Sequence, residues 1–377
     1  MTRVALLTTS LARGGAESQV AQCAIALRRR GWEVAVVPLV EPTAFAGELA
    51  AEGVTVRSLG MRPSHPDPRG LARLIGFLRV FRPQILHSHL FHANLAARVV
   101  RLFCPVPVVI STLHSVAESS RQTDSVKLRD WAYRLTDPLA DMVTAVSQAV
   151  ANRHSASGAV RPAKLRVIPN GVDTSRFRPD PARRDSARRE LGLSERFVWL
   201  AAGRLLWKKD YAALLRAFAK LASGVLLIAG DGPEGDRLRQ QARELGADAR
   251  FLGAREDLPA LMNAADGFAL SSVVEGLPMV LLEAAASGLP AVATDAGGVR
   301  EFVAEGETGF VVPRSDCHAL ADAMARLAAM PAGERARMAQ AARARAVERY
   351  DMETVAAEWE RVYREIWERV AGGGGMR

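Results

Sequence analysis

The chain has 377 residues, of which 49% are hydrophobic and 24% are charged. This length exceeds what one ordinary core accommodates, so two domains are expected, and the composition is that of a soluble globular protein. The cysteines, Cys23, Cys104 and Cys317, are scattered, which argues against a disulfide framework and against a thiolate metal site. No run of about 18 apolar residues occurs, and the first apolar residues lack the charged leader and cleavage site of a signal peptide, so we expect a cytoplasmic protein.

The net charge of +9 is distributed unevenly along the chain. Residues 1–180 carry 23 Lys and Arg against 13 Asp and Glu, whereas residues 181–377 carry 27 against 28. A basic first half would attract anionic membranes, nucleic acid or phosphorylated substrates.

In the first half, short apolar runs alternate with helical patterns. Strands that alternate with helices form parallel sheets covered on both faces, and ligands bind beyond the carboxyl ends of such strands. The expected elements are, in chain order, a strand at 4–8, a helix at 16–30, a strand at 33–39, a helix at 70–81, and strands at 84–87, 106–112, 143–147 and 165–168.

Several polar residues follow these expected strands. Gly14 and Gly15 precede a helix, where backbone without side chains can approach a ligand closely. His87, His89 and His92 suggest a metal site, but no acidic ligand accompanies them, so a polar lining of a cleft is the favoured interpretation. His114, after the next strand, is the best candidate to contact a substrate hydroxyl.

Residues 69–82 form a basic amphipathic pattern with apolar residues at 71, 74, 75, 78 and 81. An interfacial membrane helix has this pattern, and so does a helix that covers a sheet. The covering helix is favoured, and the charge asymmetry keeps the membrane alternative open.

A segment rich in turns and prolines at 170–196 marks a domain boundary, after which the alternation starts again. Two α/β domains in tandem would place a cleft between them. The expected elements of the second half are a strand at 197–202, a helix at 211–221, a strand at 225–229, a helix at 236–245, and strands at 250–252, 267–270 and 291–294.

Residues 230–235 match the dinucleotide-binding pattern G-x-G-x-x-G, with Glu256 about 20 residues further on. However, Asp231 and Glu234 place negative charge where pyrophosphate would bind, and Pro233 removes an amide donor. We therefore expect a structural turn rather than a nicotinamide site.

A better phosphate site follows the first strand of the second half, in the loop that contains Arg204, Lys208 and Lys209. A guanidinium binds two oxygens and an ammonium acts as a point charge, a pairing that suits a diphosphate. The alternative is a solvated basic loop. The sequence does not tell which of the two lysines reaches the phosphate.

Residues 271–288 place Glu275 before an expected helix and Glu283 about two turns further along, with Pro278 in the first turn and Gly288 after the last. The amides at the start of a helix bind anions, so a phosphate next to a hydroxyl-binding carboxylate is one interpretation. A surface helix with two ordinary glutamates is the other. Glycoside hydrolysis is disfavoured, because eight helical residues rise about 12 Å, beyond the carboxyl separations that glycosidases use.

Together these features resemble the family-4 retaining glycosyltransferases of the GT-B type, which carry an E-x7-E motif and of which many build bacterial polysaccharides and glycolipids. The resemblance covers nearly the whole chain, and the order and spacing of its motifs are specific. The motifs are Gly14-Gly15-Ala16-Glu17, His87-x-His89, Thr112-x-His114, Val146-Ser147, residues 168–173, Gly203-Arg204-Leu205 with Lys209, residues 230–233, Glu275 with Glu283, and residues 294–301.

The resemblance implies an α/β protein of two Rossmann-like domains whose parallel sheets face each other across a cleft. The first, at 1–175, would bind the acceptor, and the second, at 176–351, the nucleotide-sugar donor. A final helix at 352–371 would cross back to the first domain.

The resemblance also implies a role for each candidate residue. Arg204 and Lys209 would hold the donor diphosphate and stabilise it as it leaves, Glu275 would bind hydroxyls of the donor sugar, and Glu283 the ribose. The other implied contacts are the amides of Met279, Val280 and Leu281 with phosphate, Gly14 and Gly15 with the diphosphate, His114 with the donor sugar or acceptor, and Arg255 with the base. No metal is expected, because the cations take its place.

The implied function is transfer of a sugar from a nucleotide sugar, a UDP-sugar in preference to a GDP-sugar, to a lipid-linked or saccharide acceptor. The nucleotide sugar is then a co-substrate rather than a cofactor, and no nucleic-acid partner is implied. The place of action would be the cytoplasm, with peripheral association at the inner face of the plasma membrane. The alternatives are a nucleotide-sugar epimerase of similar fold and a non-catalytic nucleotide-sugar-binding subunit, and the intact Arg204, Lys209 and glutamates argue against the latter.

Overall fold

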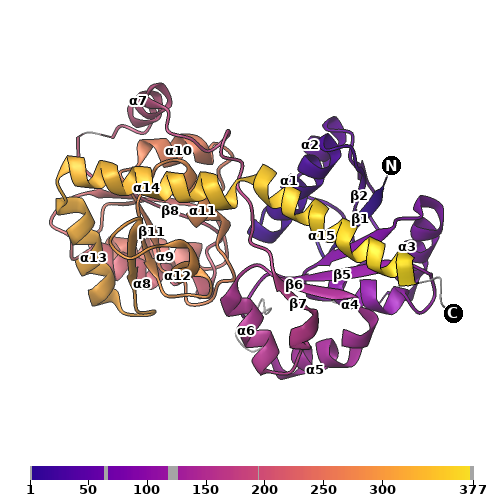
Figure 1. Cartoon of the computed structure of the whole chain (residues 1–377). Coiled ribbons are helices and arrows are strands. Elements are labelled where there is room, and N and C mark those ends of the chain that lie inside the picture. Colours follow the sequence, from indigo (N-terminus) through magenta and orange to yellow (C-terminus); the bar gives the residue numbers. More distant parts are fainter. Residues whose placement is uncertain (1, 63–66, 118–125, 194, 374–377) are drawn as a thin grey trace. The chain divides into compact units, whose positions relative to one another are not determined.

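A computed structural model describes residues 2–62, 67–117, 126–193 and 195–373. The chain divides into two compact units, one of Met1–Gly171 with Met352–Arg377 and one of Val172–Asp351 (Figure 1). The chain therefore enters the second unit four residues before the predicted start at 176, and its last helix belongs to the first unit.

The first unit is built on a seven-stranded sheet in the order β3-β2-β1-β4-β5-β6-β7, and every neighbouring pair in it is parallel. Its strands are β1 (Arg3–Thr8), β2 (Glu33–Pro38), β3 (Thr55–Val56), β4 (Ile85–His89), β5 (Val108–Leu113), β6 (Met142–Ala145) and β7 (Leu165–Val167). Its helices are α1 (Gly15–Arg29), α2 (Ala46–Ala51), α3 (Pro68–Phe81), α4 (Phe91–Val100), α5 (Val126–Thr136), α6 (Gln148–Ala156) and α15 (Met352–Gly373), with short 3₁₀ turns η1 (Asp137–Leu139) and η2 (Pro162–Lys164).

Helices cover both faces of this sheet, so its central strands are buried on both sides. Because side chains alternate along a strand, Val4 and Leu6 of β1 pack in the core beneath α1 and α15, whereas Ala5 and Leu7 pack beneath α3 and α4. α15 thus lies beside α1 although more than 300 residues separate them in the chain (Figure 1).

The helix α3 is a covering helix. It starts where the Asp67 side chain accepts a hydrogen bond from the Gly70 amide, with Pro68 in its first turn. Leu74 and Leu78 of its apolar face are buried against the sheet. The favoured interpretation of residues 69–82 is therefore confirmed, and this apolar face belongs to the core. Among the described residues, no helix is both long enough and apolar enough to span a bilayer.

The second unit contains a six-stranded sheet in the order β10-β9-β8-β11-β12-β13, again parallel throughout. Its strands are β8 (Val198–Ala202), β9 (Val225–Ala229), β10 (Ala249–Gly253), β11 (Gly267–Leu270), β12 (Ala291–Thr294) and β13 (Gly309–Val312). Its helices are α7 (Pro181–Glu190), α8 (Tyr211–Phe218), α9 (Gly235–Glu244), α10 (Leu258–Ala264), α11 (Met279–Ala286), α12 (Val299–Phe302), α13 (Cys317–Ala329) and α14 (Ala332–Tyr350), with the 3₁₀ turn η3 (Trp207–Lys209).

Each sheet has a point where the strand order reverses direction. This point lies between β1 and β4 in the first unit and between β8 and β11 in the second. The loops after these neighbouring strands lead away to opposite sides, so open α/β sheets bind their ligands at this place. The loops that contain Gly14 and Arg204 follow β1 and β8, and the stretch with Glu275 follows β11.

Replacement of Ile366 by alanine is expected to destabilise the first unit selectively. Ile366 of α15 is fully buried in the core of that unit, so its truncation should lower the free energy of unfolding by about 2–5 kcal/mol. Hydrogen exchange followed by mass spectrometry should show lost protection in β1, β2 and α1 but not in β8, β9 and α8. Arg369→Ala, at an exposed position of the same helix, is the control. Equal loss of protection in both units would contradict this assignment of α15.

Candidate functional site

The loop after β8 carries the first group of predicted residues and is held by its backbone. Gly230 and Gly232 have φ angles of +151° and +158°, and a Cβ on them would lie 2.0 Å from the Gly203 oxygen and 2.5 Å from the Leu205 oxygen. Glycine is required for this close approach. The G-x-G-x-x-G segment therefore packs against the loop that contains Arg204, in agreement with its interpretation as a structural turn.

Lys209 and Glu275 meet at the reversal point of the second sheet. The Lys209 Nζ lies 2.6 Å from the Glu275 Oε1, and the two side chains are only 16% and 12% exposed. Arg204, in the same loop as Lys209, is exposed and forms no ion pair within the part of the chain that the structure describes. The predicted residues Arg204, Lys209 and Glu275 therefore lie in the two loops on either side of the reversal point between β8 and β11.

Two hydrogen bonds to backbone oxygens join these two loops. The Val273 amide donates to the Lys208 oxygen at 2.8 Å, and the Ser271 hydroxyl donates to the Lys209 oxygen at 2.8 Å. The sequence did not distinguish between Lys208 and Lys209. In the structure, the ammonium group of Lys209 contacts the Glu275 carboxylate.

The loop that follows β12 braces Glu275 from the other side. Gly297 has a φ angle of +59°, and a Cβ there would lie 2.3 Å from the backbone carbonyl oxygen of Glu275. The Gly298 amide donates to the Gly276 oxygen at 2.7 Å. The backbone around Glu275 is therefore fixed by neighbouring loops before any ligand arrives.

The helix α11 begins directly after the loop that contains Glu275, with Pro278 as its N-cap residue. Of the three amides predicted to meet phosphate, that of Leu281 donates to the Pro278 oxygen at 3.1 Å. The amides of Met279 and Val280 have no acceptor among the described residues, as expected for the first turn of a helix.

Glu283 lies one turn further along α11 and is buried, at 7% exposure. Its Oε2 atom has no hydrogen-bond partner in the described part of the chain. Burial raises the pKa of the Glu283 carboxyl to about 7, although the positive charge of Arg176 acts to lower it. A buried carboxylate with an unsatisfied oxygen is costly unless a ligand supplies a donor.

Arg255, predicted to lie beside a nucleotide base, follows β10 and is already paired. Its Nε and Nη2 atoms donate to Asp257 at 2.7 and 2.6 Å, and this carboxylate raises the pKa of Arg255. The pair fixes the plane of the guanidinium group.

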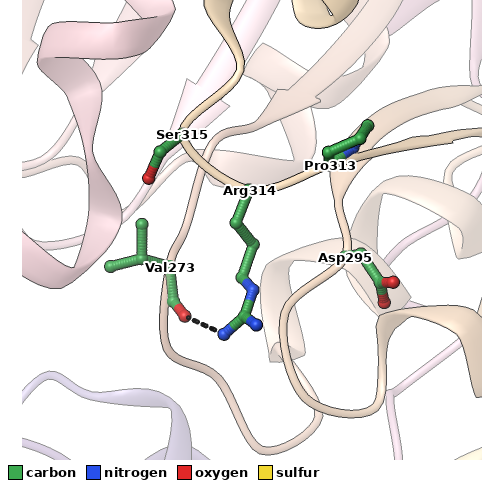
Figure 2. Close-up of a pocket in the computed structure, with 5 residues that line it drawn as sticks. All are labelled: Val273, Asp295, Pro313, Arg314 and Ser315. Atoms are coloured by element: carbon green, nitrogen blue, oxygen red, sulfur yellow. Dashed lines mark hydrogen bonds between the residues drawn. The ribbon is translucent and has the colours of Figure 1, made fainter.

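A cavity of about 470 Å³ opens next to the Glu275 loop, at the carboxyl ends of β12 and β13. Figure 2 shows its lining residues, with the Arg314 guanidinium directed at the Val273 oxygen, to which it donates at 3.4 Å. The lining residues are Val273, Asp295, Pro313, Arg314 and Ser315, so none of the predicted site residues contributes to it.

In the first unit, Gly14 is the N-cap residue of α1 and Gly15 is its first residue. A Cβ on Gly14 would lie 2.4 Å from the Glu17 Oε2, and the other oxygen of Glu17 accepts a hydrogen bond from Ser10 at 2.7 Å. Glu17 was not predicted to have a role, yet its carboxylate lies at the start of α1, next to the glycines that were predicted to approach a diphosphate.

Three of the predicted histidines, His87, His89 and His114, lie next to one another, whereas His92 is exposed and does not join them. His87 bonds to the Tyr363 hydroxyl and to the Thr112 hydroxyl, both at 2.6 Å, so both of its ring nitrogens are used. His89 bonds to His114 at 3.0 Å. Burial lowers the pKa of His87 to about 3 and that of His114 to about 4. No group of three side chains suited to a metal occurs among the described residues.

Tyr363 could not be identified from the sequence. It lies on α15, 276 residues after His87, and it occupies an ordinary apolar-face position of that helix. Only the packing of α15 on the sheet brings its hydroxyl to β4.

In comparison with known proteins, each unit matches a glycosyltransferase domain model. Residues 13–176 match the model of Glycosyltransferase Family 4, and residues 183–345 match that of Glycosyl transferases group 1. A D-inositol 3-phosphate glycosyltransferase of Saccharomonospora viridis is 33% identical over 359 residues, 84% of this chain and 82% of that protein. A GDP-mannose-dependent alpha-(1-6)-phosphatidylinositol monomannoside mannosyltransferase of Mycolicibacterium smegmatis is 39% identical over 207 residues, 51% of this chain.

The alignment with this mannosyltransferase spans 54% of its length, about half of that relative. Among solved structures, HepE of Anabaena in complex with UDP-glucose superimposes with a TM-score of 0.86 at 25% identity, covering 97% of this chain and 100% of HepE. The two parallel α/β sheets, the two matching domain models and these relatives together show that the chain belongs to the glycosyltransferases that combine a family 4 domain with a group 1 domain in the GT-B fold.

Proposed function

We propose that this protein is a retaining glycosyltransferase that moves a sugar from a nucleotide sugar to a lipid-linked or saccharide acceptor in the synthesis of cell-surface polysaccharide or glycolipid. The observation that carries the proposal is the contact of Lys209 with Glu275 beside the exposed Arg204, at the reversal point of the second sheet. A cation pair and a carboxylate at this position suit a ligand with a diphosphate at one end and hydroxyl groups at the other.

In the proposed reaction, the bond from the anomeric carbon to phosphate breaks, which leaves positive charge on the sugar and negative charge on the diphosphate. Arg204 and Lys209 neutralise the leaving oxygens, together with the amides at the start of α11. Fixed charges that are already oriented lower this barrier because they need not reorganise during the reaction. The acceptor attacks the face that the diphosphate leaves, and the leaving phosphate takes the acceptor proton.

The two glutamates bind opposite ends of the donor in this proposal. Glu275 accepts hydroxyls of the donor sugar and is held in place by Lys209 when no donor is bound. Glu283 accepts ribose hydroxyls, which would satisfy its unpartnered oxygen. Arg255, oriented by Asp257, lies beside the base.

The donor is a UDP-sugar or a GDP-sugar, with UDP preferred. HepE was solved with UDP-glucose, whereas the mycobacterial relative is named for GDP-mannose, so both bases occur among similar proteins. The name of the same relative includes a phosphatidylinositol glycolipid, which supports a lipid-linked acceptor. No metal is required in this proposal, because Arg204 and Lys209 supply the positive charge.

Peripheral binding to an anionic membrane would bring the enzyme to such an acceptor. Residues 1–180 contain the entire charge excess of the chain. In addition, three apolar side chains of α5 are exposed to solvent: Leu128 at 64%, Trp131 at 58% and Leu135 at 63% of their surface. Their spacing in the sequence places them on one side of the helix. Apolar side chains next to positive charge favour the membrane interface.

Loss of the cations is expected to abolish most turnover. Arg204→Ala and Lys209→Ala should each lower kcat by about 10²–10³, as removal of one charge-stabilising group does in other enzymes. Lys208→Ala is the matched control and should retain most turnover. The measurement is release of nucleoside diphosphate from a panel of UDP- and GDP-sugars with lipid-linked acceptors, with and without excess EDTA, which should not change the rate.

Wild-type turnover in both Arg204→Ala and Glu275→Ala would overturn the proposal, and so would the absence of binding to every nucleotide sugar in calorimetry. Release of free sugar or of an epimer without an acceptor would point instead to a nucleotide-sugar epimerase or hydrolase.

Nucleotide binding is expected to strengthen as pH rises through the pKa of Glu283. Because this pKa is raised to about 7, the carboxyl is mostly neutral at pH 6 and mostly ionised at pH 8, and only the ionised form accepts with both oxygens. Between these pH values the ionised fraction of a carboxyl with this pKa rises about tenfold, so the affinity for UDP or GDP should increase about tenfold more in the wild type than in Glu283→Gln. Calorimetry on both proteins separates this effect from titration of the phosphate, which is common to both. Equal pH dependence in the two proteins would exclude the assigned role.

Membrane binding is expected to depend on charge and on α5. Anionic liposomes should retain the protein at low salt and release it at high salt, because ions screen surface charges. Trp131→Glu should weaken retention several-fold, whereas Val347→Glu, at an exposed apolar position of α14, should not. Co-sedimentation measures this binding, and a protein that stays in solution at low salt would rule the membrane proposal out.

A further inference from the structure

Among the described residues, hydrogen bonds from three different elements hold His114 and its chain neighbours in place. Asn94 of α4 donates to the Thr112 oxygen at 3.0 Å, just before His114 in the chain. His154 of α6 lies with its Nε2 3.1 Å from the Ser115 oxygen, just after it. His89, the last residue of β4, bonds to the imidazole itself, with its Nδ1 3.0 Å from the His114 Nε2. Two of these bonds therefore fix the backbone around His114, and the third orients its ring.

The surroundings of His89 determine which ring donates in this last bond. His89 is 2% exposed, and its Nε2 atom has no hydrogen-bond partner within the described residues. Its nearest aromatic neighbour, His87, lies with the ring centroids 4.1 Å apart, but both nitrogens of His87 are bonded to the hydroxyls of Tyr363 and Thr112. His87 therefore cannot satisfy the Nε2 atom of His89.

At neutral pH both rings of the His89–His114 pair are uncharged, because burial lowers the pKa of each. A neutral imidazole carries one N–H group, so one ring must donate and the other accept. A proton on His89 Nε2 would be a buried donor without an acceptor, and such orphaned N–H groups are rarer and more costly than unsatisfied lone pairs. The lower-energy arrangement puts the proton of His89 on Nδ1, from where it donates to His114 Nε2.

We infer that His89 is a positioning residue that fixes the tautomer of His114, so that the His114 Nε2 accepts from His89 and the His114 Nδ1 carries the ring proton. The inference rests on the proposed function for the part that concerns substrate, in which His114 faces the donor sugar or acceptor. A neutral imidazole whose donor nitrogen is fixed suits a sugar hydroxyl or ring oxygen better than a phosphate, because it donates a hydrogen bond without contributing charge.

The tautomer can be observed directly by long-range ¹H–¹⁵N correlation spectroscopy of the histidine rings, with His114→Gln identifying the His114 signals. In the wild type at pH 7.5 or so, the His114 Nε2 should appear unprotonated and the Nδ1 protonated. His89→Leu should move the proton of His114 to Nε2. His89→Asn retains a side-chain N–H donor and should preserve the wild-type tautomer. His87→Leu, two residues earlier in the same strand, is the matched control and should also preserve it.

A protonated Nε2 of His114 in the wild type would overturn the inference, as would an unchanged tautomer in His89→Leu or an equal change in His87→Leu. The kinetic consequence is a loss of about tenfold in kcat/KM for His89→Leu, the value of one hydrogen bond, with recovery in His89→Asn. A changed tautomer with unchanged kcat/KM would show that His89 does not act on the reaction. If the wild type transfers no sugar, the proposed function fails while the spectra still decide the tautomer.

Discussion

The contact between Lys209 and Glu275 is the interaction on which the site of the second unit depends. The two residues are 66 positions apart and meet at 2.6 Å only because β8 and β11 are neighbours in the sheet. Each charge is largely removed from water, so neither could be kept in this place without the other. They neutralise each other in the structure, and in the proposed reaction a donor with negative charge and hydroxyl groups replaces the contact on both sides.

Close backbone packing keeps this pair in position. Gly230, Gly232 and Gly297 each lie where a Cβ would come within 2.5 Å of a neighbouring carbonyl oxygen, so the loops after β8, β9, β11 and β12 support one another directly. Such contacts are rigid, because protein backbone cannot yield as a long side chain does. The charged groups are thus oriented before substrate binds, which is what electrostatic stabilisation of a transition state requires.

The predicted site residues of the two units differ in their charge. In the second unit the predicted site residues Arg204, Lys209 and Glu275 are charged and lie in two loops. In the first unit the polar group beyond β4 and β5 is neutral, since burial holds the pKa values of His87 and His114 far below 7. A neutral, hydrogen-bonding surface suits sugar hydroxyls, whereas the basic character of residues 1–180 lies in other side chains.

The sequence by itself determined the elements whose signals are local. The strands at 225–229, 267–270 and 291–294 were predicted with the bounds that the structure has, because each is a short apolar run that glycine or proline limits. It also identified Arg204, Lys209, Glu275 and Glu283 as candidates, since their motifs lie within short segments. The helix predicted at 211–221 ends at Phe218, and β13 was not foreseen. Only the tertiary structure decided that Lys209 contacts Glu275 and that Tyr363 bonds to His87. Contacts between segments that are distant in the chain depend on strand order and helix packing, which local periodicity does not contain.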